Sequence, residues 1–255
     1  MTGWCTFRSL MTIIGLALLL GVRAAPAATF VVTSSADTSG STCGSVCTLR
    51  QAITAANATS AADTINFAIV TVPPRGDILI QPGSNLPAIT QPLTINGYSQ
   101  GGSRANDSVT ASNATLRIRI DGALNSASHG LAICASNTTV RGIAVTRFVT
   151  HGIIVGDTPC AASVSNVQLH GNCIGTTGGG SASAGNTGAG IRVASSQVSI
   201  GSTALADRNL VSANGVFGIE LRGTFSGNSE IRNNLIGTDR TGSQDFGNGI
   251  GIRVS

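Results

Sequence analysis

One stretch of this sequence occurs twice, and that repetition constrains the fold more than any other feature. Residues 172–193 read NCIGTTGGGSASAGNTGAGIRV, and residues 234–254 read NLIGTDRTGSQDFGNGIGIRV. Each copy contains a short strand-like run, a turn rich in Gly, Ser, Asn or Asp, and a second short run, with no helical period. A segment that returns nearly unchanged at fixed distance is typical of repeat proteins, so the sequence predicts an all-β solenoid.

The individual coils of this solenoid are marked by a Gly-apolar-x-apolar motif. Its uneven spacing indicates that the turns vary in length while the strands stay short, in roughly six coils of two or three strands after Asp77. Aliphatic side chains are expected to stack inside, and an Asn before several strands suits a stacked amide ladder or a left-handed turn position. The motif starts at Gly130, Gly152, Gly190, Gly218 and Gly251, and the asparagines are Asn172, Asn209 and Asn234.

Stacking of these motifs predicts the register of the outward side chains. Arg192, Glu220 and Arg253 should form one column of alternating charge, because adjacent strands lie about 4.8 Å apart. The same register places His129 beside His151. The histidine column continues as apolar residues, which suits packing better than metal ligation, so no metal site and no cofactor are expected.

The charge pattern argues against a nucleic-acid partner. The formal net charge is +4, all 15 basic residues are Arg, and only 10% of the chain is charged. The arginines form no run, and Arg141, Arg192, Arg222 and Arg253 are widely scattered. We therefore expect no nucleic acid among the partners.

The N-terminus has the features of an export signal, predicted as residues 1–27. Arg8 precedes the apolar run from Leu10 to Val22, and Ala25-Pro26-Ala27 offers a small-residue cleavage site. The run is too short to span a membrane comfortably, and no later segment is long and apolar enough. The sequence therefore predicts a protein that is secreted or held at the cell surface, with no transmembrane segment after cleavage.

Five cysteines follow the leader, and export allows them to form disulfides. Cys43 and Cys47 enclose a short loop that can bring their Cα atoms within disulfide reach, so this pair is predicted to be bonded. Cys173 aligns with Leu235 in the repeat, which predicts a reduced thiol at an apolar inward position. The only other candidate pair is Cys134 and Cys160.

Residues 28–70 are predicted to be an N-terminal cap on the first coil. A β-rich run at 29–33 precedes the most convincing helical segment, at 48–57, where Thr48 and Gln51 are spaced as a capping box. An uncovered first coil would expose an unpaired strand edge and an open apolar end, and a helix there would cover both. Residues 71–255 are assigned to the solenoid itself.

The cap and the segments that follow it carry a family resemblance. They are TFVVTSSADT at 29–38, CTLRQAITAAN at 47–57, ADTINF at 62–67, NLPAITQPLTINGYSQGG at 85–102, IDGALNSASHGLAI at 120–133 and the two NxIGT repeats. Together they resemble secreted bacterial CSLREA-type proteins, although Thr48 and Gln51 stand where that signature has Ser and Glu. The resemblance implies a right-handed parallel β-helix exported to the cell surface or medium, and it brings no catalytic residues with it.

Enzymatic cleavage of an acidic polysaccharide is the main alternative function. Such chemistry needs clustered carboxylates with a strong base, or two acids about 5–9.5 Å apart. The chain has no Lys, and acids such as Asp121, Asp157, Asp207, Glu220 and Asp239 are separate in sequence. Asp207 and Asp239 are the nearest candidates on adjacent coils, but each is more simply a turn residue. No catalytic residue is therefore assigned.

The expected function is that of an exported, non-catalytic surface module, adhesin-like and either structural or binding. Its expected partner is an extracellular polysaccharide or a cell-surface component. A polysaccharide lyase or glycoside hydrolase is the first alternative, and a phage-spike-like or matrix protein is the second. The chain stops inside a coil-starting strand at Ser255, so we also expect a truncated end whose exposed edge pairs with missing sequence or with another chain.

Overall fold

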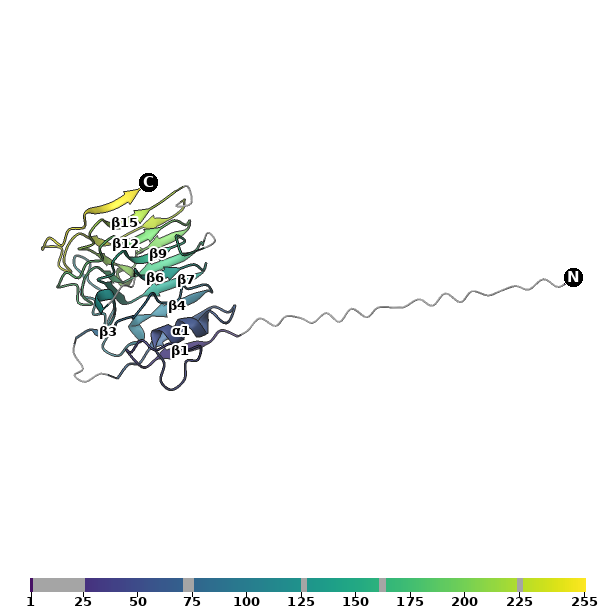
Figure 1. Cartoon of the computed structure of the whole chain (residues 1–255). Helices are drawn as coiled ribbons and strands as arrows, with labels where there is room; N and C mark the ends of the chain where they lie inside the picture. The colour runs from purple at the N-terminus through teal and green to yellow at the C-terminus, as the bar shows by residue number, and fades with distance from the viewer. Residues whose placement is uncertain (2–25, 71–75, 125–127, 161–163, 224–226) are drawn as a thin grey trace.

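The computed structural model describes residues 1, 26–70, 76–124, 128–160, 164–223 and 227–255, and their strands form three sheets. In Figure 1 the strands lie one above another, from β1 and the helix α1 at one end towards β15 near the C-terminus. The predicted signal peptide, residues 1–27, lies almost entirely outside the described residues. Within those ranges no helix is long and apolar enough to cross a membrane.

Each sheet is built from strands that are far apart in the sequence. Sheet A contains β1 (Thr29–Val32), β2 (Asp63–Phe67), β4 (Leu93–Asn96), β7 (Thr138–Arg141), β10 (Val167–His170), β13 (Val198–Ile200) and β16 (Glu230–Ile231). Sheet B contains β3 (Ile78–Ile80), β5 (Ile118–Asp121), β8 (Ile143–Thr146), β11 (Cys173–Ile174), β14 (Leu210–Val211) and β17 (Leu235–Ile236). Sheet C contains β6 (His129–Ile133), β9 (His151–Val155), β12 (Ala189–Val193), β15 (Phe217–Leu221) and β18 (Ile250–Val254).

The chain visits the sheets in a constant order, A then B then C, in successive passes that begin at β4, β7, β10, β13 and β16. Every pairing between these strands is parallel. An earlier pass, β2 then β3, ends in a single parallel bridge between Ile89 and Ile133. The predicted all-β class is therefore confirmed, with strands of successive passes paired in parallel.

The α-helix among the described residues is α1 (Leu49–Ala56), in the predicted N-terminal segment. Its buried side chains join the main apolar core, and β1 and β2 on either side of it form the first two strands of sheet A. The segment 28–70 therefore continues sheet A, and α1 lies against β1 and β2. The part of the chain that the structure describes also contains three short 3-10 turns: η1 (Gly97–Ser99), η2 (Gly122–Leu124) and η3 (Leu205–Asp207).

The Gly-apolar-x-apolar motifs are the strands of sheet C, in the predicted register. Arg192 is paired with Glu220, and Glu220 with Arg253, on neighbouring strands. His129 is paired with His151 in the same way. The predicted outward column and the predicted histidine pair are both confirmed.

One apolar core extends through all three sheets. In sheet A its members lie directly above one another, because identical register is kept from strand to strand. Each fully buried aliphatic side chain of this kind contributes about 1.5–3 kcal/mol before entropic costs. The stacked residues of sheet A are Ile65, Ile95, Val140, Leu169 and Ile200.

Cys173 is a free and buried thiol, but it does not belong to the main core. Ile174 takes that place, because successive side chains of a strand point to opposite faces. Cys173 instead packs with Leu116 and Leu210 in a second apolar cluster on the other face of sheet B. The predicted inward position was therefore wrong: this sheet is covered on both faces, and an apolar residue fits either one.

Asparagine side chains form ladders at two corners of the stack. The backbone N–H of Asn172 donates to Oδ1 of Asn209 at 2.8 Å, and the N–H of Asn209 donates to Oδ1 of Asn234 at 3.1 Å. This is the predicted amide ladder. A second ladder, which we did not predict, joins Nδ2 of Asn186 to Oδ1 of Asn214 and Nδ2 of Asn214 to Oδ1 of Asn248, each at 2.9 Å.

Candidate functional site

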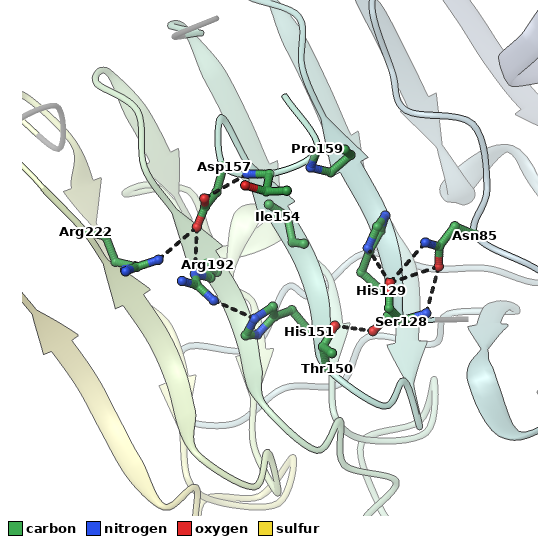
Figure 2. A pocket seen from close by; sticks show the side chains of 11 residues that line it. Asn85, Ser128, His129, Thr150, His151, Ile154, Asp157, Pro159, Arg192 and Arg222 are labelled. Atoms are coloured by element: carbon green, nitrogen blue, oxygen red, sulfur yellow. Dashed lines mark hydrogen bonds and ion pairs between the residues drawn. The ribbon is translucent and has the colours of Figure 1, made fainter. Parts of the chain in front are cut away.

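The outer face of sheet C carries a groove with a volume of about 510 Å³, lined mostly by residues with polar side chains. Four lining residues are strand side chains: His129 of β6, His151 and Ile154 of β9, and Arg192 of β12. Figure 2 shows them between two groups of loop residues, with Asn85 and Ser128 at one end and Asp157 and Arg222 at the other. The remaining lining residues are Thr150, Thr158 and Pro159.

Two arginines and two acids form an ion network at one end of the groove. Oδ2 of Asp157 lies 2.8 Å from Nε of Arg192 and 3.2 Å from Nη1 of Arg222. The carboxylate of Glu220 lies 3.5 Å from the same Nε of Arg192 and 3.8 Å from Nε of Arg222. Asp157 therefore holds the two guanidinium groups side by side. Glu220 interacts electrostatically with the same two groups.

Glu220 lies deeper than Asp157 in this network. Its side chain is 7% exposed, compared with 22% for Asp157. Burial raises the pKa of the Glu220 carboxyl, while the charge of Arg253 acts in the opposite direction. Asp157 lines the groove and Glu220 does not, so Glu220 acts on the groove through the arginines.

The imidazole of His151 meets a hydrogen-bond donor at each of its ring nitrogens. The backbone N–H of Ala189 donates to Nδ1 at 3.0 Å, and Nη1 of Arg192 lies 2.8 Å from Nε2. A neutral imidazole has one nitrogen that accepts, because the other carries the proton. The ring can therefore accept from only one of these donors. If it accepts from Ala189, the Nη1 group of Arg192 is left without an acceptor.

The Asn85 end of the groove is fixed to the N-terminal helix. The side chain of Asn85 donates to Oγ of Ser128 at 3.0 Å and accepts from its backbone N–H at 2.7 Å. The backbone carbonyl of Asn85 accepts from Nη1 of Arg50, a residue of α1, at 2.9 Å. Oγ of Ser128 in turn lies 3.0 Å from Nδ1 of His129.

The Asp157 end of the groove is fixed to β6. Cys160 is disulfide-bonded to Cys134, which directly follows that strand, so the candidate pair is present. The backbone N–H of Gly156 donates to the carbonyl of Ile133 at 3.0 Å, which ties the start of the loop to the same strand. Asp157 is thus held between two attachment points.

Burial lowers the pKa of both groove histidines, His129 and His151, below the ordinary value of 6.5. In the unfolded chain these rings bind protons as the pH falls through about 6.5, while in the folded protein they stay neutral to lower pH. The unfolded state then holds more protons, so folding stability should decrease as the pH falls below about 6.5. Above that pH the contribution is fully present.

We expect the urea midpoint of the wild type to be lower at about pH 5.5 than at about pH 7.5. A double variant, His129→Gln with His151→Gln, should show a smaller decrease over the same interval. His170, whose pKa is also lowered by burial, remains in the variant and accounts for residual dependence. An equal pH dependence in wild type and double variant would contradict this assignment.

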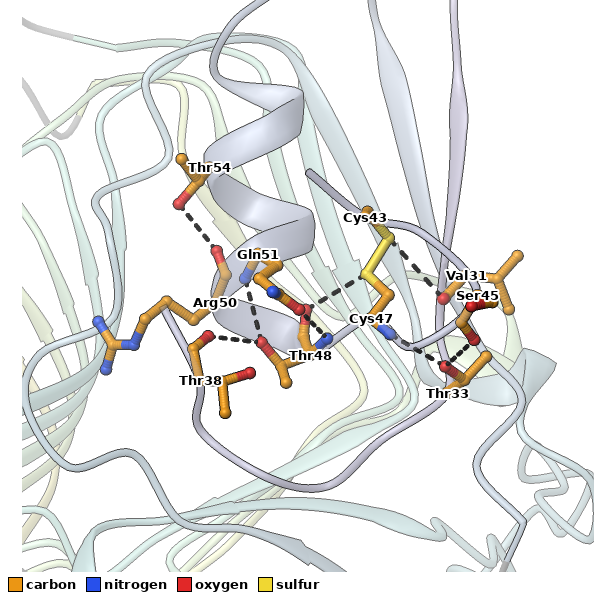
Figure 3. The surroundings of a disulfide bond; sticks show 10 residues. All are labelled: Val31, Thr33, Thr38, Cys43, Ser45, Cys47, Thr48, Arg50, Gln51 and Thr54. Atoms are coloured by element: carbon orange, nitrogen blue, oxygen red, sulfur yellow. Dashed lines mark hydrogen bonds between the residues drawn. A yellow bond between two sulfur atoms is a disulfide. The ribbon is translucent and has the colours of Figure 1, made fainter. Parts of the chain in front are cut away.

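The predicted disulfide and capping box are both present (Figure 3). None of their residues lines the groove. Cys43 and Cys47 are bonded with their Cα atoms 4.7 Å apart. Oγ1 of Thr48 accepts from the backbone N–H of Gln51 at 3.3 Å, and Oε1 of Gln51 accepts from the N–H of Thr48 at 3.0 Å. These residues are structural elements of the N-terminal segment.

The fold brings together acids that are separate in the sequence. Asp157 and Glu220 meet on the guanidinium of Arg192, which sequence spacing did not indicate. Asp207 and Asp239 behave as turn residues: Asp207 accepts from Ser202 at 2.6 Å, and Asp239 accepts from Thr241 at 2.8 Å. Among the side chains that the structure describes, no three His, Cys, Asp or Glu gather closely enough to hold a metal ion.

Neither a scan against protein-family models nor a search of curated proteins found a match to this chain. The function is therefore inferred from the chemistry of the groove. It offers charge-assisted donors from Arg192 and Arg222 and neutral donors and acceptors from Asn85, Ser128 and Thr158. Such a surface is suited to holding a polar, oxygen-rich ligand.

Proposed function

We propose that this chain is an exported right-handed parallel β-helix of the CSLREA type that acts as a non-catalytic, adhesin-like surface module. In this proposal residues 1–27 are the signal peptide, residues 28–70 cap the first coil, and residues 71–255 form the helix. The constant A–B–C order of the strands, with parallel pairing between successive passes, supports the architecture. The two disulfides are compatible with an oxidising compartment.

The groove on sheet C is the observation that carries the binding role. We place an extracellular polysaccharide there, because an elongated sugar chain presents hydroxyl groups that the amide, hydroxyl and guanidinium groups of the groove can pair with. The parallel pairing of β6, β9, β12 and β15 holds the strand residues of this surface in register. Both ends of the groove are held in place, one by Arg50 and the other by the Cys134–Cys160 bond.

A lyase or hydrolase is the alternative, favoured by the meeting of Asp157 and Glu220 on Arg192. The arrangement supports binding better than cleavage, because both carboxylates are engaged by arginines. Glu220 is also nearly buried and does not line the groove, so it cannot reach a ligand there without movement.

The test is to incubate the purified chain with galactan, cellulose, alginate and polygalacturonate, measuring retention by affinity electrophoresis and cleavage by new reducing ends. We expect retention by at least one polymer without any new ends. New reducing ends would establish the enzymatic alternative. No retention by any of the four would overturn the binding role.

Export is tested separately by expressing the full precursor in a bacterium and sequencing the N-terminus of the protein that leaves the cytoplasm. A mature N-terminus at or near Ala28 is expected. Recovery of unprocessed protein in the cytoplasm alone would contradict the localisation.

A further inference from the structure

We propose that the groove recognises the carboxylate of a uronic acid, and that Arg192 and Arg222 are the residues that bind it. This inference rests on the proposed carbohydrate-binding role and names the group that is recognised. Its starting point is an excess of hydrogen-bond donors at one end of the groove.

Arg192 is the clearest case of unused donor capacity. A guanidinium carries five N–H donors in a planar fork. For Arg192 the hydrogen-bond partner among the described residues is the His151 ring, which also receives the N–H of Ala189 and cannot accept from both. Nε of Arg192 is buried without a well-formed hydrogen bond, although Asp157 lies close enough for an ion pair. An acceptor on a ligand would pair with the Nη donor of Arg192 that the His151 ring cannot satisfy, while the buried Nε stays beside Asp157.

Arg222 presents a second fork beside the first. Its Nη1 donates to Asp157 at 3.2 Å, and its contact with Glu220, at 3.8 Å, is electrostatic and too long for a hydrogen bond. The side chain is 43% exposed, so its remaining donors can reach a ligand. Because Asp157 touches both guanidinium groups, it fixes the spacing between them and acts as a positioning residue.

The local charge balance also favours an anion. Arg253 is paired in register with Glu220 and stacks over the ring of Phe217, with its guanidinium carbon 5.0 Å from the ring centre. Arg192, Arg222 and Arg253 therefore lie near two carboxylates, Asp157 and Glu220, although Arg253 does not itself line the groove. The groove histidines carry no compensating charge, and they can only become cationic.

A carboxylate fits this end of the groove better than a neutral group, because a guanidinium fork matches its two coplanar oxygens. The rest of the groove suits the sugar ring that carries it. Ile154 offers an apolar floor, and Ser128, Thr150 and Asn85 offer hydroxyl and amide groups at the far end. The groove would therefore bind the carboxylate at its arginine end and the sugar hydroxyl groups at its Asn85 end.

The decisive comparison uses matched ligands. Isothermal titration is carried out with galacturonic acid hexamers, the same hexamers methyl-esterified, a neutral galactose hexamer and a sulfated galactose hexamer. Esterification removes the charge while keeping the sugar backbone. We expect the acid hexamer to bind about tenfold or more tightly than its ester, because charge-assisted hydrogen bonds are lost.

Variants locate the effect. Arg192→Gln and Arg222→Gln should each weaken binding of the acid hexamer about tenfold, and each should weaken binding of the uncharged ester by a clearly smaller factor. Arg192→Lys, which keeps the charge and loses the fork, should fall between wild type and Arg192→Gln. Arg232→Gln is the matched control, since Arg232 directly follows β16, is half-exposed and pairs with Glu230 away from the groove. Circular dichroism tests whether each variant is folded. If the Arg192 variants do not fold, the comparison is made with Arg222→Gln, because the half-exposed Arg222 is less involved in packing.

Each outcome decides between the two proposals. Equal binding of acid and ester, tighter binding of the sulfated hexamer, or an equal loss in Arg232→Gln would overturn carboxylate recognition while leaving the carbohydrate-binding role intact. Absence of binding for all four hexamers, together with no retention by any polymer, would overturn both.

Discussion

Replacing Arg50 with alanine should lower the free energy of unfolding by about 3 kcal/mol, because a largely buried ion pair loses one partner. Nε and Nη2 of Arg50 contact the two oxygens of Asp37 at 2.8 and 3.0 Å. The same guanidinium donates to the carbonyls of Ser84 and Asn85, each at 2.9 Å. Alanine would leave Asp37, whose side chain is only 13% exposed, without its countercharge. Urea unfolding followed by circular dichroism measures the change.

Arg104→Ala is the control for Arg50→Ala. Arg104 also forms an ion pair, with Asp107 at 3.4 Å, but both side chains are mostly exposed. Such surface pairs contribute about 0–1 kcal/mol, so this variant should unfold close to the wild type. Similar small losses in both variants would show that the N-terminal helix is not held to the stack through Arg50.

Replacing Asn209 with alanine should also cost about 3 kcal/mol, because buried hydrogen-bonding groups would lose their partners. Oδ1 of Asn209 accepts from the N–H of Asn172 at 2.8 Å. Its Nδ2 donates to the carbonyl of Leu169 at 2.8 Å and to Oδ1 of Asn234 at 2.9 Å. The loss would be measured by the same urea titration.

A matched pair of aspartates isolates the ladder from general effects. Asn209→Asp removes the Nδ2 donor and sets a carboxylate against two acceptor oxygens, so it should destabilise at least as much as alanine. Asn228→Asp makes the identical change at an exposed turn residue and should stay within about 0.5 kcal/mol of wild type. Equal effects at the two positions would contradict a structural role for the ladder.

The repeats allowed sheet C to be predicted because they preserve a local pattern. Gly-apolar-x-apolar is short enough to be recognised at each copy, and equal register then follows for Arg192 and Glu220. The ladder of Asn186, Asn214 and Asn248 was missed because these residues lie in the turns before the motif, four residues before its glycine in two copies and three in the third. The face occupied by Cys173 was predicted wrongly because β11 has only two residues. So short a strand shows no alternation of apolar and polar side chains that would indicate which face is inward.

The groove could not be predicted from sequence for a different reason. Its residues belong to different passes of the chain, and the loops between passes differ in length. Asp157, Arg192 and Arg222 therefore look scattered, although Asp157 contacts both arginines in the fold. Asn85 and Ser128 belong to the segments that carry the family resemblance, but nothing in those segments indicates their contact with each other.

The central claim, that successive passes stack as one continuous column, is tested most directly by distances between spin labels. Thr64, Gln168 and Glu230 belong to one column of paired residues in sheet A. In strand order the column runs Thr64, Thr94, Thr139, Gln168, Ser199 and Glu230. Cysteines at Thr64 and Gln168, or at Thr64 and Glu230, can be labelled without reaction at Cys173, since burial raises the pKa of that thiol to about 12.

With strands about 4.8 Å apart, the labels at Thr64 and Glu230 should be about 10 Å further apart than those at Thr64 and Gln168. This increase corresponds to the two extra strands in the column, β13 and β16. A Thr64–Glu230 distance equal to or shorter than the Thr64–Gln168 distance would contradict the stacked arrangement. It would also contradict the groove, whose residues are brought together by that stacking.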